Sequence, residues 1–177
     1  RAYPLGEEGR PARGGRTTQA RAAALDAIVD YLDVAAPAHR RYQPQGGATY
    51  CNIYATDFAY LCGAYLPRVW WSGPALRRIA AGETVAVSYG QTVRDPTLLQ
   101  AAANAGEVCL IVAQRRDLNS PGHITVVVSE RDGAVARRNA RGEVVQPLES
   151  QAGTRNVLRA PAANAWWLHA RFRAHAF

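Results

Sequence analysis

The sequence predicts an α+β domain in which helices come first along the chain and antiparallel strands follow. In the first half, apolar residues recur with the three-to-four-residue spacing of helices. In the second half, short β-branched runs alternate with glycine-containing turns. This order of elements is typical of an α+β arrangement. With 177 residues, 48% of them hydrophobic, the chain is long enough for one well-buried core and short for two domains.

The first residues differ in composition from the rest of the chain. Residues 1–16 are rich in glycine, proline and charge, and such a segment buries too little apolar surface to order itself. We therefore expect a flexible arm or linker there and a single domain over 17–177. That domain begins with a helix over 17–34, which Thr17 or Thr18 caps.

A second helix follows a loop. Residues 43–48 contain a proline and paired glycines, which interrupt regular structure. Residues 49–66 then return to helical apolar spacing, so Cys51 should stand at the entrance of a helix.

Turn residues and local apolar runs predict the remaining elements. Asp95 and Pro96 are typical of an N-cap and a first helical position, so a helix should run through Asn104 and stop at Gly106. Weaker patterns predict a short helix over 75–81, a strand or extended loop over 84–89, strands over 108–113, 123–129, 134–138 and 143–148, and hairpin turns at 131–133 and 140–142.

Cys51 is the candidate nucleophile. At a helix start, unpaired backbone N–H groups and the positive end of the helix dipole favour a thiolate over a thiol. A thiolate is the reactive form of cysteine. The backbone N–H of Cys51 is also a natural donor to an oxyanion.

His123 is the candidate base. It follows a turn with the sequence Asn-Ser-Pro-Gly and precedes a β-branched run, so its ring should stand at the very start of a strand. From there it could take the proton of the cysteine.

A third group should orient the imidazole from a strand adjacent to that of His123. We predict Gln151 for this role, with Asn156, Ser150 and Glu149 as alternatives. All four are equally compatible with being plain loop residues.

Further polar and aromatic residues are candidates for contact with a substrate. Tyr50 precedes the nucleophile, whereas Asp57 is rotated away from it on a 3.6-residue period and should bond to backbone or to an arginine. Two tryptophan pairs occur, at 70–71 and 166–167, and one member of each is expected in the core and the other on the wall of a groove. The predicted substrate-binding residues are Tyr50, Asn52, Trp70, Trp71, Gly122 and Asn156.

The charge of the chain restricts its partners. The formal charge of +7 and the pI near 9.8 indicate an anionic environment, such as nucleic acid, a membrane surface or an acidic polymer like bacterial cell wall. Codon bias alone would explain a composition with arginine and no lysine equally well. No apolar run approaches the roughly 20 residues of a membrane span. Methionine is absent, so we expect the chain to be part of a longer polypeptide.

The three cysteines do not make a complete disulfide framework. Cys62 and Cys109 are predicted to be core residues, with a bridge between them as an alternative if the protein works outside the cytosol. No cluster has the ligand spacing of zinc, so we expect neither a metal nor another cofactor.

Several of these segments resemble a known family. The residues around Cys51, namely Thr49, Tyr50, Asn52, Tyr54 and Asp57, are similar to those of papain-like peptidoglycan hydrolases of the NlpC and CHAP kind. So are the segments 62–71, 122–124 and 150–153. The likeness covers roughly residues 40–172 and is greatest to phage lysins and type VI secretion effectors.

The resemblance implies a papain-like fold, with a helix-borne cysteine packed on an antiparallel sheet. It also implies amidase or endopeptidase action on the peptide stems of peptidoglycan, in the bacterial periplasm or cell wall, and an immunity or inhibitor protein as a partner. Two alternatives stay open. One is a papain-like toxin that acts on a protein as a protease, deamidase or transglutaminase. The other is a non-catalytic basic domain that binds a partner or nucleic acid through its arginines. The leading hypothesis predicts no nucleic-acid partner.

Overall fold

The computed structural model describes residues 5–64, 66, 93, 95–131 and 133–177 of the chain. Its helices are α1 (Thr18–Leu32), α2 (Cys51–Leu61), α4 (Pro96–Asn104) and the kinked 3-10 segment η2 (Ala163–Leu168). Its strands are β1 (Cys109–Arg115), β2 (His123–Val127), β3 (Arg137–Arg138), β4 (Val144–Gln146), β5 (Leu148–Gln151), β6 (Val157–Pro161) and β7 (Phe172–Ala176). The elements predicted over 75–81 and 84–89 lie outside the described residues.

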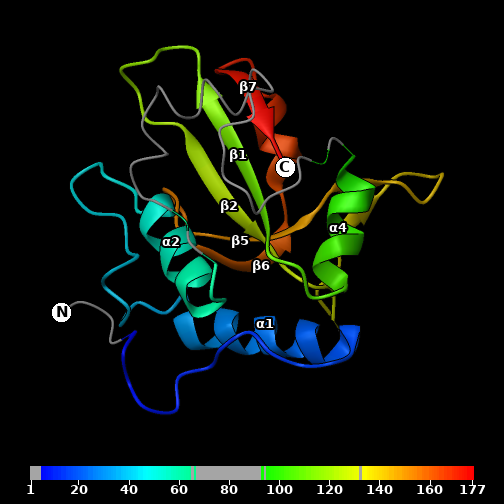
Figure 1. The fold of residues 1–177 in the computed structure, drawn as a ribbon. Helices are drawn as coiled ribbons and strands as arrows, with labels where there is room; N and C mark the ends of the chain where they lie inside the picture. The colour runs from blue at the N-terminus through cyan, green and yellow to red at the C-terminus, as the bar shows by residue number, and fades with distance from the viewer. Residues whose placement is uncertain (1–4, 65, 67–92, 94, 132) are drawn as a thin grey trace.

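An antiparallel sheet with the strand order β6-β5-β2-β1-β7 forms the centre of the fold. Figure 1 shows α2 and α4 on opposite sides of β1 and β2. Because side chains alternate along a strand, one face of the sheet carries Val112, Ile124 and Val126, which pack with α1 and α2. The other face carries Ile111 and Val127, which pack with α4 and η2. The predicted α+β class, with helices packed on an antiparallel sheet, is confirmed.

The predicted helix starts agree with the structure. Thr17 caps α1 by accepting a hydrogen bond from the N–H of Ala20 at 3.1 Å. Asp95 caps α4 by accepting one from the N–H of Thr97 at 2.7 Å. Residues 5–16 carry no helix or strand, yet Arg13 forms an ion pair with Glu107 at 2.8 Å.

The strand predictions were less complete. Pro147 has no N–H to give to a ladder, and it separates β4 from β5 where one strand was expected over 143–148. β6 and β7 were not predicted at all. The residues of β7 alternate in exposure, with Phe172 buried and Arg173 and His175 exposed. That alternation in the sequence was the signal that could have revealed the strand.

Gln100 fastens α4 to the two strands that position the candidate site. Its side chain is buried. Its Oε1 accepts from the N–H of Leu148 at 2.7 Å, and its Nε2 donates to the carbonyl of Val128 at 2.9 Å. The amide therefore joins the end of β2 to the start of β5.

Helices α1 and α4 approach each other at Gly106, which follows α4 with a φ of 79°. A Cβ atom at this position would lie 2.4 Å from the Cβ of Arg21 and 2.6 Å from the backbone N of Ala22. Glycine therefore meets two requirements here, a left-handed backbone and the space for a neighbouring helix.

Candidate active site

The loop that leads to Cys51 is fixed by a buried ion pair. Asp57, on α2, accepts hydrogen bonds from Arg41 Nε at 2.5 Å and from a terminal Arg41 nitrogen at 2.9 Å. The hydroxyl of Tyr42 donates to the same carboxylate at 3.0 Å. Asp57 and Tyr42 are both buried. The prediction that Asp57 bonds to an arginine rather than acting in the site is confirmed, and Arg41 is that arginine.

Cys51 is the first residue of α2, as predicted, and its side chain is half-buried. Three backbone N–H groups act on its sulfur, those of Cys51 itself, Asn52 and Ile124. The first two come from the open end of the helix. Ile124 is the second residue of β2, and β5 pairs with β2 at Val126 and Val127. The sulfur thus lies against the first residues of β2, where His123 begins the strand.

His123 is held by contacts on two sides. Its Nε2 lies 2.5 Å from Oε1 of Gln151, the last residue of β5. Its ring meets the indole of Trp166 edge-on, with 4.7 Å between the centroids. The structure therefore brings His123 and Gln151 together, on adjacent strands.

The partner of His123 also fixes which nitrogen holds the proton. An amide Oε1 only accepts hydrogen bonds, so Nε2 carries the hydrogen and Nδ1 keeps a lone pair. In the described part of the chain the sulfur and the imidazole make no hydrogen bond with each other. The sulfur lies against the backbone N–H of Ile124, the residue after His123, and the lone pair of the neutral imidazole is on Nδ1.

The other candidates for the third position have different partners. The hydroxyl of Ser150 lies 2.6 Å from that of Tyr54 and ties β5 to α2. Glu149 accepts from Trp166 Nε1 at 2.9 Å. Asn156 donates to the backbone carbonyls of Val34 and Tyr42 at 2.8 and 3.0 Å. The amide group of Asn156 thus joins two loops, and Gln151 is the candidate that contacts the imidazole.

The protonation state differs from the one expected. Burial raises the pKa of the Cys51 thiol, and this exceeds the opposite effect of the three N–H groups on its sulfur. Burial also lowers the pKa of His123, against the effect of its bond to Gln151. The expectation of a resting thiolate is therefore wrong. Desolvation outweighs the helix end, and the resting pair is a neutral thiol and a neutral imidazole.

Alkylation of Cys51 by iodoacetamide should consequently accelerate as the pH rises beyond the pKa of an ordinary cysteine. The reagent attacks the thiolate, and the raised pKa leaves little thiolate at pH 7. Mass spectrometry of the labelled peptide as a function of pH measures the midpoint, with glutathione as the reference thiol. Burial raises the pKa of Cys62 and of Cys109 to about 12, so neither should compete. A midpoint below that of glutathione would contradict the expectation.

A buried carboxyl group, that of Glu149, contacts the same tryptophan as the imidazole. Glu149 is 1% exposed, and burial raises its pKa to about 7, more than the hydrogen bond from Trp166 and the nearby Thr125 hydroxyl lower it. Trp166 thus contacts both His123 and Glu149. Sequence reasoning placed Glu149 only among the alternatives to Gln151. Its burial arises from η2, which covers this face of the sheet.

Replacing Glu149 with glutamine should remove a pH dependence of stability. A carboxyl whose folded pKa is raised from 4.5 to about 7 stabilises the fold below pH 4.5 and loses that contribution as the pH rises to 7. A glutamine oxygen still accepts from Trp166 and does not titrate. Relative to the wild type, the free energy of unfolding of Glu149→Gln should therefore be about 2–3 kcal/mol higher at pH 8 than at pH 4.

Urea unfolding at both pH values measures the difference. Glu143→Gln, which changes an exposed acid, is the matched control and should follow the wild type. A variant that loses stability with pH as steeply as the wild type would contradict the assignment to Glu149.

The remaining predicted residues fall in three groups. Tyr50, Asn52 and Gly122 adjoin Cys51 or His123 in the chain and are half-buried. Trp70 and Trp71 lie outside the described residues. Cys62 and Cys109 are free and buried. They belong to the clusters on opposite faces of the sheet, so the prediction of core cysteines is confirmed and the alternative of a bridge between them is wrong.

The site contains a thiol at a helix end, an imidazole and an orienting amide, a combination suited to nucleophilic attack on a carbonyl group. Comparison of the chain with protein-family models, with curated proteins and with solved structures gave no match. Among the described helices, none has the length and apolar character to cross a membrane. The described residues contain no group of three His, Cys, Asp or Glu side chains placed to hold a metal ion.

Proposed function

We propose that the chain is a papain-like cysteine hydrolase that cleaves amide bonds in the peptide stems of bacterial peptidoglycan. The observation that carries the proposal is the position of the Cys51 sulfur, at a helix end and against the strand on which His123 is bonded to Gln151. Such a site consists of a nucleophile, a base and a residue that orients the base. Here they come from α2, β2 and β5.

The reaction begins when Nδ1 of His123 takes the proton of Cys51 as the sulfur attacks the amide carbonyl. A C–S bond forms, and backbone N–H groups at the start of α2 stabilise the oxyanion. The imidazolium then gives its proton to the leaving nitrogen, and the C–N bond breaks to leave a thioester. Water, activated by the same imidazole, attacks the thioester, which releases a carboxylate and restores the thiol.

The neutral resting pair fits this sequence of steps. A neutral imidazole can act as a general base that takes the proton of the thiol as the C–S bond forms, so that no resting ion pair is needed. The bond from Gln151 keeps the imidazole in the tautomer with a lone pair on Nδ1. The role of Gln151 is therefore orientation.

The choice of peptidoglycan as substrate is supported by charge and by sequence likeness. The chain carries a net charge of +7, which favours association with an anionic wall polymer. The segments around Cys51 and His123 resemble those of wall hydrolases. The proposed site of action is the bacterial periplasm or cell wall, with an immunity or inhibitor protein as a partner that would block the site.

Digestion of purified sacculi tests the proposal. The wild type should release soluble muropeptides whose masses identify the bond, whereas Cys51→Ala should release none. Cys109→Ala, which removes a buried thiol on the opposite face of the sheet, is the matched control and should keep the activity.

Two results would count against the proposal. Release by Cys51→Ala at the wild-type rate would show that Cys51 is not the nucleophile. If sacculi stay intact while proteins in a cell extract are modified in a Cys51-dependent way, Cys51 is the nucleophile but the substrate is a protein and not peptidoglycan.

A further inference from the structure

Two arginines, Arg115 and Arg171, lie at the same end of the sheet as His123. Ala113 pairs with His123 across β1 and β2, and paired residues direct their side chains to the same face. Arg115 comes two positions after Ala113 on β1 and therefore shares that face. Phe172 on β7 pairs with Arg115, and Arg171 immediately precedes Phe172.

Both guanidinium groups stack on one aromatic ring. The central carbon of Arg115 lies 5.5 Å from the centroid of the Phe172 ring, and that of Arg171 lies 4.9 Å from it. Contact with the ring face holds each cation in place. Two positive charges on one small ring repel each other, and an anion bound between them would offset that repulsion.

The arginines next to this pair in the chain have hydrogen-bond partners that Arg115 lacks. Arg116 donates its Nε to the carbonyl of Ala170 at 2.6 Å, and Arg173 donates its Nε to Gln114 at 2.8 Å. The Nε of Arg115, in contrast, is buried without a hydrogen-bond partner among the described residues, as are those of Arg21 and Arg159. A buried donor of this kind requires an explanation, and a ligand that accepts its hydrogen bond would provide one.

The acid nearest to Arg115 is engaged elsewhere. Asp117 is exposed, and its carboxylate accepts from the Ser120 hydroxyl at 2.7 Å and from the Asn119 N–H at 3.0 Å. Arg115 acts on it only at a distance, by lowering its pKa. Of the described acids, none forms an ion pair with Arg115 or Arg171.

The charge of the pair reaches the proposed catalytic base. After burial, which is the main cause, the fields of Arg171 and Arg115 add to the lowering of the pKa of His123. A group bound between the two guanidinium groups would therefore lie within electrostatic reach of the imidazole.

We propose that Arg115 and Arg171 bind a carboxylate that the substrate carries close to the scissile amide, and that this contact sets specificity. That the carboxylate belongs to a substrate rests on the proposed function. That the two arginines bind a carboxylate rests on the contacts described above. Peptides with free side-chain or terminal carboxylates are the chemical class that it selects. Guanidinium groups suit such ligands because they give two parallel hydrogen bonds to one carboxylate.

The test compares a stem peptide that carries a free carboxylate next to the cleaved amide with the same peptide as a carboxamide. The wild type should favour the carboxylate by about tenfold to a hundredfold in kcat/KM, the range for a hydrogen bond to a charged group. Arg115→Met and Arg171→Met keep an apolar stem over Phe172 and should each lose most of that preference.

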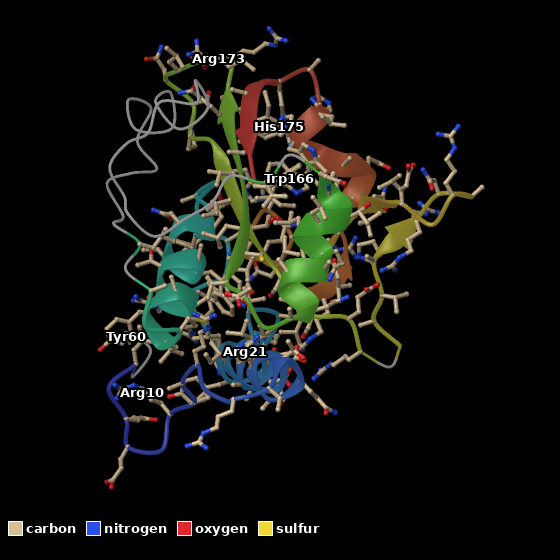
Figure 2. All side chains as sticks on the ribbon, turned by 45° about the vertical axis from the view of Figure 1, so that its right-hand side comes forward. Arg10, Arg21, Tyr60, Trp166, Arg173 and His175 are labelled. Atoms are coloured by element: carbon tan, nitrogen blue, oxygen red, sulfur yellow. The ribbon has the colours of Figure 1, made fainter. Side chains whose placement is uncertain are left out.

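Arg116→Met and Arg173→Met are the matched controls, since they remove the same charge within two residues of the tested arginines. Arg173 is labelled at the upper end of the molecule in Figure 2, above Trp166. Both controls should keep the preference for the carboxylate. Equal preference in all four variants, or no preference in the wild type, would overturn the inference.

A binding measurement separates this inference from the proposed function. Calorimetry with Cys51→Ala needs no turnover, and the carboxylate peptide should bind at least tenfold more weakly when Arg115→Met is added. If the wild type cleaves neither peptide, this loss of affinity still supports the carboxylate site. Unchanged affinity, or binding of inorganic phosphate and not of the peptide, overturns it.

Discussion

Replacing His123 with alanine should lower kcat for amide hydrolysis by about three orders of magnitude, within the range for loss of a general acid–base. The variant loses the group that takes the proton of Cys51 and returns it to the leaving nitrogen. Since burial raises the pKa of Cys51, the thiol alone ionises too little at neutral pH to compensate. Initial rates of muropeptide release, followed by chromatography, measure the effect.

Two further variants complete the comparison. One changes a histidine outside the site, and the other changes the residue that orients the imidazole. His175→Ala alters an exposed residue of β7 and should leave the rate within twofold. Gln151→Ala should fall between the two, because the imidazole remains but its tautomer is no longer fixed. A rate for His123→Ala within tenfold of the wild type would remove His123 from the mechanism.

Asp57→Asn should destabilise the fold by about 3 kcal/mol, the lower end of the cost of breaking a buried ion pair, because Asp57 is buried whereas Arg41 is half-buried. The side chain of Asp57 is 2% exposed and that of Arg41 19%, so water replaces little of the lost interaction. Tyr42 also loses the carboxylate to which it donates. Urea unfolding, followed by tryptophan fluorescence, measures the change.

The control for this effect is Glu8→Gln, which removes an exposed acid and should stay within about 0.5 kcal/mol of the wild type. Asp57→Asn should in addition reduce activity at temperatures where it is folded, because Arg41 and Tyr42 position the loop before Cys51. A loss of less than 1 kcal/mol would show that the ion pair is not a main support of this loop.

Those parts of the fold that depend on local rules could be predicted from the sequence. Thr17 and Asp95 act through hydrogen bonds to residues two or three positions away, so their helices could be predicted from the residues alone. Cys51 and His123 were placed at the starts of a helix and a strand for the same reason. β6 was missed because its side chains are half-buried without clear alternation, which leaves no periodic signal to detect.

The parts of the site that depend on distant contacts could not be predicted. The partner of Asp57 lies 16 residues away and that of His123 lies 28 residues away. Gln151 was one of four polar residues on the same segment, and sheet register decides among them. The protonation of Cys51 was misjudged because the helix end is visible in the sequence, whereas burial by the rest of the fold is not.

The narrow contact between α1 and α4 has a consequence for evolution. Only a hydrogen atom fits at position 106, since a methyl group there would overlap the backbone of Ala22. Homologous chains that keep this arrangement of helices should therefore retain glycine at that position, however much their surfaces diverge.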